Sequence, residues 1–356
     1  MSMVISLVLL FLACLSLSFV EEQISDRDKK IIYVIFGFVM IMIAGLREVG
    51  STPDTLSYEE MYYSKEGDLM ALLREPSFDI ISSFLHSLSL GINGLFFAYA
   101  IISVPIQLSA LWKLSKIPLL TLTIYISYYY MIHDMVQIRC AVASGLFLWA
   151  IYFYANQKKL YTLLFILLGT FFHYSAIAGL LIFFLGNDFP RWQRNVLYTI
   201  VPIGLLVYFT HFDIFSIIPD EWGGLKLMKY RTMREKGIDD ELAGWKLERN
   251  LLIWMNFVLY YACIYYHDYL VKHYKYTSIA IKLQGVGFCF LFFANALSQV
   301  VGNRMNDYFS VASVLLWTAS IYAFSPLLFG KIVSNVISTI RFVTSVLAYG
   351  LALLLM

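Results

Sequence analysis

The chain has 356 residues, of which 60% are hydrophobic and only 14% are charged, and its mean hydropathy is +0.71. Soluble globular domains carry roughly a quarter charged residues, so this composition excludes that class. A net charge of +2 is too small to suggest a nucleic-acid partner. The apolar residues form long runs rather than alternating segments of about ten residues, which favours membrane-spanning helices over a β-barrel.

The sequence therefore predicts an all-α, polytopic integral membrane protein with about 10–12 transmembrane helices in a single transmembrane domain, 1–356. The first apolar run, 3–20, lacks the basic start of a signal peptide and is followed by basic residues, so we expect a retained span with its N-terminus outside. Further spans are expected near 31–46, 93–112, 117–132, 138–156, 195–211, 249–270, 279–300, 307–327 and 332–354.

The segment 160–186 allows two interpretations: one long helix, or two short helices that meet at His173. Lysines and arginines of short loops collect on the cytoplasmic side of a membrane. A single helix would place four of them outside, whereas a hairpin keeps them together, so we expect the hairpin. The predicted cytoplasmic residues are Arg27, Lys29, Lys30, Lys113, Lys116, Lys158, Lys159, Arg191, Arg194, Lys272, Lys275 and Lys331.

Two long loops then face outward, 47–91 and 212–248. The first is acidic and ends in an amphipathic stretch, for which we expect a helix lying in the membrane interface. The residues of its expected apolar face are Phe78, Ile81, Phe84, Leu85 and Leu88. The second loop mixes both charges. We expect it to be solvated, and the alternative is that its basic half binds an anionic polymer or a lipid headgroup.

Three arginines lie among apolar residues at the predicted outer surface, where His173 joins them. An arginine at membrane depth costs about 2.5–3.5 kcal/mol on insertion scales, which invites a functional explanation. Guanidinium groups bind phosphate oxygens bidentately, so such a cluster suits a lipid diphosphate. The alternative for each is snorkelling, or pairing with a local carboxylate such as Asp134 or Asp307. The three are Arg47, Arg139 and Arg304.

Short motifs occur in a fixed order from about Ala44 to Phe309. In this order, the chain resembles the EpsG-like branch of the Wzy-type polysaccharide polymerases. The motifs are an arginine that ends an early span (Arg47), Asp-Thr-x-x-Tyr (from Asp54 to Tyr58), Glu-Pro-x-Phe (from Glu75), Gln-x-Arg-x-x-x-Ala (from Gln137), Phe-His-x-Ser-Ala (around His173) and Asn-Arg-x-x-x-Tyr-Phe (from Asn303).

The resemblance implies a GT-C-like, metal-independent inverting glycosyltransferase of the bacterial inner (cytoplasmic) membrane, with its active site facing the periplasm or outside. Such an enzyme joins undecaprenyl-diphosphate-linked oligosaccharide repeat units into a surface polysaccharide such as capsule or O-antigen. It transfers the growing glycan to a sugar hydroxyl of the incoming unit and releases undecaprenyl diphosphate. A chain-length regulator protein is an implied partner, besides membrane lipid. We expect no cofactor and no metal.

The attacking hydroxyl needs a base, and the outward candidates are His173, Glu75 and Asp54. We place His173 first because a neutral imidazole accepts a proton near pH 7. The alternatives are that His173 caps a backbone carbonyl, that Glu75 pairs with Arg74, and that Asp54 is a turn residue after Pro53.

Three further residues are candidates for contact with sugars: Tyr58, Tyr308 and Gln137. For the two tyrosines the alternative is a place in the aromatic belt of the membrane interface.

The alternative function is a transporter or flippase of lipid-linked oligosaccharide. Transporters place their polar site near the bilayer midplane and often show inverted repeats, whereas here the polar motifs gather on one face and we find no repeat.

Overall fold

The computed structural model describes residues 2–52, 54–64, 74–210, 212, 250–295, 298–324 and 326–355. Within these ranges the chain forms helices and no strand, which confirms the all-α class. Four helices are long and apolar enough to cross a membrane: Ile92–Leu114, Ile138–Ala155, Thr277–Ala294 and Leu327–Ala348. Shorter apolar helices accompany them, as expected for a multi-pass membrane protein.

The chain forms two compact units, which are described separately. Unit 1 consists of Met1–Leu180 and Trp317–Met356, and unit 2 of Leu181–Leu316. The helices of unit 1 are α1 (Ser2–Phe19), η1 (Glu21–Gln23), α2 (Asp26–Gly45), α3 (Thr55–Tyr63), α4 (Pro76–Ser87), α5 (Ile92–Leu114), α6 (Pro118–Ile126), the π-helix η3 (Tyr130–Val136), α7 (Ile138–Ala155), α8 (Lys159–Phe172), η7 (Ile321–Ala323) and α18 (Leu327–Leu355), and the last residue of η4 (Tyr174–Leu181) belongs to unit 2.

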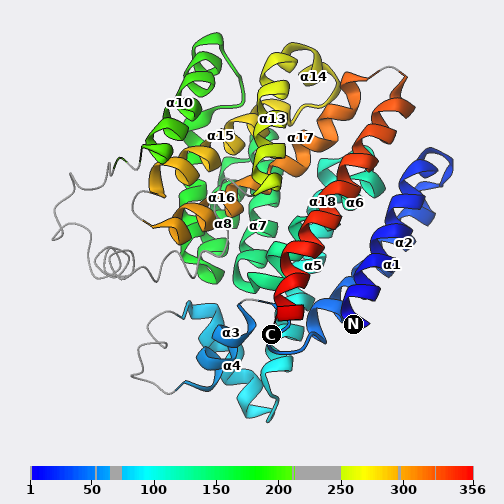
Figure 1. Ribbon diagram of the computed structural model, residues 1–356, viewed down its shortest axis with the longest axis vertical. Coiled ribbons are helices and arrows are strands. Elements are labelled where there is room, and N and C mark those ends of the chain that lie inside the picture. The colour runs from blue at the N-terminus through cyan, green and yellow to red at the C-terminus, as the bar shows by residue number, and fades with distance from the viewer. Residues whose placement is uncertain are drawn as a thin grey trace. The chain divides into compact units, whose positions relative to one another are not determined.

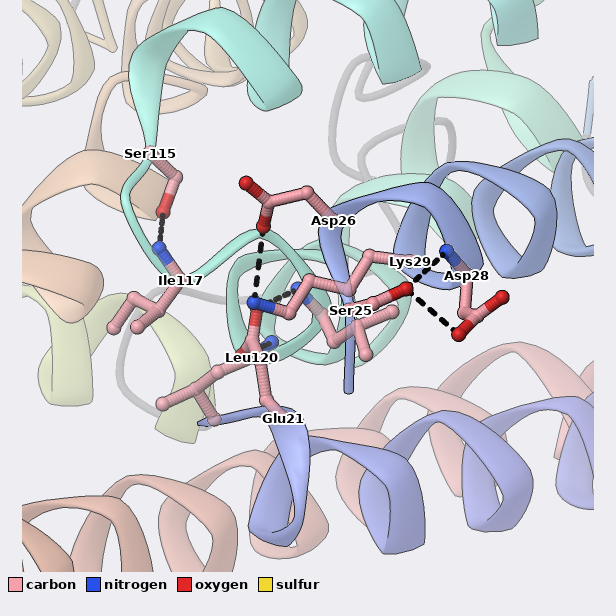
Figure 2. Close-up of polar contacts among 9 residues, drawn as sticks. Glu21, Ser25, Asp26, Asp28, Lys29, Ser115, Ile117 and Leu120 are labelled. Carbon is pink, nitrogen blue, oxygen red and sulfur yellow. Dashed lines mark hydrogen bonds and ion pairs between the residues drawn. The ribbon is translucent and has the colours of Figure 1, made fainter. Parts of the chain in front are cut away.

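Polar contacts at one end of unit 1 satisfy the first backbone N–H groups of α6. Glu21, in the turn after α1, is 1% exposed, and its carboxylate accepts the N–H of Leu119 at 2.8 Å and of Leu120 at 3.1 Å. A helix leaves its first N–H groups without a partner and favours negative charge there, so Glu21 caps α6 across 98 residues of sequence. Figure 2 shows Glu21 at Leu120, and Ser25 beside Asp28 at the start of α2.

The last helix begins at this same end. Lys331 of α18 forms an ion pair with Glu22 at 2.9 Å, and the side chains of Asn335 and Ser18 are hydrogen-bonded at 3.0 Å. We call this the basic end, because it holds many of the predicted cytoplasmic residues: Arg27, Lys29, Lys30, Lys113, Lys116 and Lys331.

The opposite end of unit 1 carries the segment that follows α2. Arg47 donates to the carbonyl of Asp134 at 3.2 Å, and Thr52 donates to the carbonyl of Met135 at 2.9 Å. In Figure 1, α3 and α4 lie at this end, away from the turn between α1 and α2. We call it the loop end. The helices of unit 1 thus alternate in direction, as the predicted spans require.

The segment 160–186 is a hairpin rather than one helix. Helix α8 ends at Phe172, and His173 is extended, with φ −150° and ψ 115°. A Cβ built on Gly169 would lie 3.5 Å from the Cβ of Ala176, whereas residues seven apart in a continuous helix are separated by about 10.5 Å. The chain therefore turns back at His173, which confirms the interpretation from loop charges.

Helix α4 forms within the predicted amphipathic stretch, and only part of its apolar face is buried. Phe78 and Leu85 are buried at 0% and 5% exposure, while Phe84 and Leu88 are 62% and 54% exposed and lie beside the exposed Ile80. One edge of the apolar face therefore packs on a core, and the other edge is exposed. That these exposed apolar residues lie in the membrane interface stays a prediction.

In unit 2, a lysine takes the place of a conventional cap. Lys282 is 1% exposed, and its Nζ donates to the carbonyls of Leu185 at 2.7 Å, Gly186 at 2.5 Å and Asp188 at 2.6 Å. All three ammonium donors are used, and they fix the turn before α10. The helices of this unit are α9 (Ile182–Leu185), α10 (Arg191–Phe209), α13 (Leu251–Tyr265), α14 (His267–His273), α15 (Thr277–Ala294) and α16 (Gln299–Ser310), and α17 (Ser313–Ser320) contains the boundary with unit 1.

Two expectations for unit 2 have different outcomes. We expected a loop near 301–306, but α16 covers this stretch and packs on α15. It begins there because α15 already ends at Ala294 and because Ser298 caps the new helix by accepting the N–H of Val301. The predicted second outer loop, 212–248, lies outside the described residues apart from its first position.

The cap formed by Glu21 predicts a stability effect. Glu21→Ala removes the acceptor of two buried N–H groups and should lower the unfolding free energy by about 2–3 kcal/mol. Glu21→Gln keeps one acceptor oxygen and should lose about half as much. Thermal unfolding in detergent measures both. The control is Glu60→Ala, at an exposed position of α3, and equal stability of Glu21→Ala and this control would contradict the assigned role.

Candidate active site

The structure joins two of the predicted catalytic residues with one predicted diphosphate ligand. The carboxylate of Glu75 forms an ion pair with the guanidinium Nη1 of Arg139, and its other oxygen lies 3.0 Å from Nδ1 of His173. These three residues come from the start of α4, the first turn of α7 and the residue after α8. We call them the Glu75 cluster.

The local backbone explains how these side chains meet. Glu75 is extended and precedes Pro76, which occupies the first turn of α4 and suits that position because it needs no N–H partner there. The extended conformation of His173 ends α8 and leaves its ring beside Glu75. Arg74 pairs with Asp79 at 3.2 Å, so the alternative that Glu75 pairs with Arg74 is wrong.

An aromatic platform supports the cluster. The guanidinium carbon of Arg139 lies 5.3 Å from the ring centre of Tyr58 and 5.8 Å from that of Phe78. Tyr58 is 4% exposed, so this tyrosine is not a lipid-facing member of an aromatic belt. Aromatic faces attract a guanidinium, and their exclusion of water strengthens the ion pair beside them.

The platform also contains two residues that the sequence reasoning missed. Tyr99 of α5 is 1% exposed, its hydroxyl lies 3.3 Å from Ser77 Oγ, and its ring packs edge-on against Phe172. Ser77 is the variable position of the Glu-Pro-x-Phe motif, so it could have been noticed. Nothing in the sequence near Tyr99 distinguishes it from the many other tyrosines.

The charge state of Glu75 follows from its neighbours. Its side chain is 5% exposed, and burial alone would raise its pKa. The hydrogen bond with His173 and the positive charge of Arg139 outweigh that effect, so the pKa of Glu75 is lowered and the carboxylate is ionised at neutral pH. An ionised carboxylate at Nδ1 orients the imidazole with its second nitrogen, Nε2, on the side away from Glu75, as in hydrolase dyads.

Arg47 has a different environment from the one expected. It is 2% exposed, and its Nη1 donates to the carbonyls of Ala44 and Asp134. Its guanidinium carbon lies 4.1 Å from the ring centre of Phe96. The alternative that Arg47 pairs with the Asp134 carboxylate is not what the structure shows, because that carboxylate accepts from Ser103 and Tyr125.

These contacts hold the π-helix η3 in place. Arg47 and Thr52 donate to the carbonyls of Asp134 and Met135, the residues that precede the Gln-x-Arg motif. Gln137 itself ends η3 and leads into α7. A π-helix is rare and often marks a functional site. Arg47 therefore supports the segment that presents Arg139, and its direct contact with a diphosphate stays a prediction.

Three more of the predicted residues, besides Arg47, Tyr58 and Gln137, lie outside the Glu75 cluster. Asp54 is the residue before α3, where its carbonyl accepts the N–H of Tyr58 at 3.0 Å, which agrees with a turn position. Arg304 and Tyr308 belong to α16 of unit 2, and Tyr308 is fully buried against Phe309. Because the two units are described separately, joint action of Arg304 with Arg139 stays a prediction.

The lowered pKa of Glu75 predicts a pH-dependent stability. The cluster stabilises the fold above the ordinary glutamate pKa of about 4.3 and loses this contribution as the pH falls through the lower folded value. Glu75→Gln should lower the unfolding free energy by about 2–3 kcal/mol from pH 7 down to about pH 5, and by progressively less as the pH falls from about 4 to about 2.

Thermal unfolding of both proteins in detergent across this pH range measures the difference. The control is Asp79→Asn, which removes a pair whose carboxylate is 53% exposed and should change stability by less than about 1 kcal/mol. A difference between wild type and Glu75→Gln that stays constant with pH would contradict the assignment.

Comparisons with known proteins agree with the motifs. The EpsG family matches residues 30–356, which is nearly the whole chain and includes every residue of the Glu75 cluster. No curated protein and no solved structure matches. With the ordered motifs and a multi-pass helical fold, this match shows that the chain belongs to the EpsG family of Wzy-like polysaccharide polymerases.

Proposed function

We propose that this polymerase joins undecaprenyl-diphosphate-linked oligosaccharide repeat units at the outer face of a bacterial inner membrane. The observation that carries the proposal is the Glu75 cluster, in which an ionised carboxylate holds an imidazole and a guanidinium together. A base and a fixed cation side by side suit the transfer of a sugar from a diphosphate to a hydroxyl.

In the proposed step, a sugar hydroxyl of the incoming unit attacks the anomeric carbon of the growing glycan from the face opposite the diphosphate. The bond from that carbon to the diphosphate oxygen breaks, and undecaprenyl diphosphate leaves with the electron pair. The hydroxyl proton passes to Nε2 of His173. Glu75 keeps the ring in the tautomer that accepts at Nε2 and stabilises the imidazolium that forms.

Arg139 is the residue proposed to stabilise the leaving diphosphate. A guanidinium keeps its positive charge at all relevant pH values and its planar N–H donors match phosphate oxygens. The side chains of Arg139 and His173 are 11% and 12% exposed, so both are nearly buried but reach the surface. Because cations stabilise the developing charge in this scheme, we propose a metal-independent, inverting reaction. Arg47 and Arg304 are proposed as further contributors on the motif order alone, and a chain-length regulator as a partner.

The test is polymer formation by the purified protein in liposomes, with its undecaprenyl-diphosphate-linked repeat unit and EDTA present. The wild type should give a ladder of regularly spaced products on a gel. A single unreacted repeat unit, together with movement of this lipid across the sealed bilayer, would replace the transferase with a flippase. A ladder that EDTA abolishes would overturn the metal-independent route.

Variants assign the roles. His173→Ala should lower the rate about 10²–10⁴-fold through loss of the base, and Arg139→Ala about 10²–10³-fold through loss of charge stabilisation. The matched control is Arg74→Ala, since Arg74 lies one residue from Glu75 but pairs with Asp79. It should keep a rate within a few-fold of wild type. Thermal unfolding checks that each variant is folded, and normal rates in a folded His173→Ala would remove His173 from the mechanism.

A further inference from the structure

Helix α18 of unit 1 contains a buried arginine near the middle of its predicted span. Arg341 is 1% exposed and lies ten residues after Lys331, whose ion pair with Glu22 marks the basic end. At 1.5 Å per residue, Arg341 is about 15 Å from that end, which is half of a hydrocarbon core of about 30 Å. Its neighbour Ser345 donates to the carbonyl of Ser127 at 3.1 Å, which fixes α18 against the end of α6.

The guanidinium lies in a cage of aromatic side chains. Its central carbon is 5.6 Å from the ring centre of Tyr128, 5.5 Å from that of Tyr129 and 5.3 Å from that of Trp317. Within the described part of the chain, no ion pair joins Arg341 to a carboxylate, and apart from a contact with the Tyr129 hydroxyl its Nε, Nη1 and Nη2 have no hydrogen-bond partner. Cation–π attraction offsets part of the cost of burial, and a single phenol oxygen can satisfy only part of the five N–H donors.

This arrangement is unusual for a group with a purely structural role. Buried polar groups almost always have hydrogen-bond partners, and an ionisable residue at membrane depth is a functional candidate by default. Another deeply buried cation, Lys282 of unit 2, uses all three donors on carbonyls. Arg341 instead presents a planar set of donors with aromatic rings on its faces, and the groups that complete such a set are phosphate oxygens.

We propose that Arg341 binds a phosphate-type anion inside the membrane, at a site distinct from the Glu75 cluster. The rings of Tyr128 and Tyr129 lie beside the guanidinium and form part of the wall of this site. Tyr129 is fully buried, whereas Tyr128 and Trp317 are 5% and 6% exposed, so the anion enters by displacing one of these two rings. Identification of the anion as the diphosphate of a lipid-linked substrate rests on the proposed function, in which two such lipids bind at once.

Trp317 provides a local signal, because its ring contacts the guanidinium. Detergent-purified protein is titrated with geranylgeranyl diphosphate, with inorganic diphosphate and with geranylgeraniol, and the emission of Trp317→Phe is subtracted at each step. We expect a saturable change with the lipid diphosphate and none with the alcohol. Equal half-saturation by inorganic diphosphate would identify free phosphate as the ligand, and a much weaker response would identify the lipid headgroup.

Arg341→Gln should weaken this response at least tenfold. Arg341→Lys keeps the charge without the planar guanidinium and should also weaken the response. If Arg341→Gln does not fold, Arg341→Lys provides the test of the site. An unchanged response in a folded Arg341 variant, or an equal response to the alcohol, would overturn the site.

Arg139→Ala separates this site from the proposed function. It should lose polymer formation but keep the Trp317 response. A Trp317 response from a wild-type protein that makes no polymer would leave the anion site in place while the proposed function fails. Polymer formation without a Trp317 response would support the proposed function and overturn the anion site.

Discussion

The carboxylate of Glu75 is the interaction on which the loop end of unit 1 depends. It is the common partner of Arg139 and His173, and it connects the start of α4 to the start of α7 and to the end of α8. Without it, a guanidinium and an imidazole would meet in an aromatic environment with no compensating charge, which a low-dielectric site does not tolerate. The same carboxylate that holds the helices together also sets the orientation of the proposed base.

The wider constraint is that a membrane interior offers no water to polar groups. Unit 1 meets it by pairing groups from distant helices: Ser103 and Tyr125 donate to Asp134, and Gln107 donates to the carbonyl of Ala141. These contacts surround the π-helix, where the regular pattern of backbone hydrogen bonds changes. Arg341 departs furthest from this rule, because all three of its side-chain nitrogens have no ordinary hydrogen-bond partner among the described residues.

Much of the fold could be predicted, because lipid demands helices and because loop charge reports which side a loop is on. The turn at His173 followed from counting lysines and arginines, and the local motifs placed the residues of the Glu75 cluster on the same surface. The pairing of Glu75 with Arg139 could not be derived, since 64 residues separate them and several acids and bases were available. The rotation of α4 depended on a core that its own sequence does not reveal.

Arg341 satisfies the same membrane-depth criterion as the three predicted arginines. Arg341 was not among the predicted site residues, because those arginines were chosen for lying at the outer surface and Arg341 lies in the middle of the last span. The helix at 299–310 was missed for a related reason. Hydropathy detects apolar spans, whereas α16 is a polar helix held by its cap and by α15.

The contacts of α18 with α1 and α6 have a consequence for biosynthesis. Unit 1 is discontinuous in sequence, and residues 181–316 are synthesised before its last helix. Until α18 arrives, Ser18, Glu22 and the carbonyl of Ser127 lack the partners that they have in the finished protein. Unit 1 thus lacks its last helix for the time needed to synthesise more than a third of the chain. During this time, chaperoning by other membrane components would protect these polar groups from lipid.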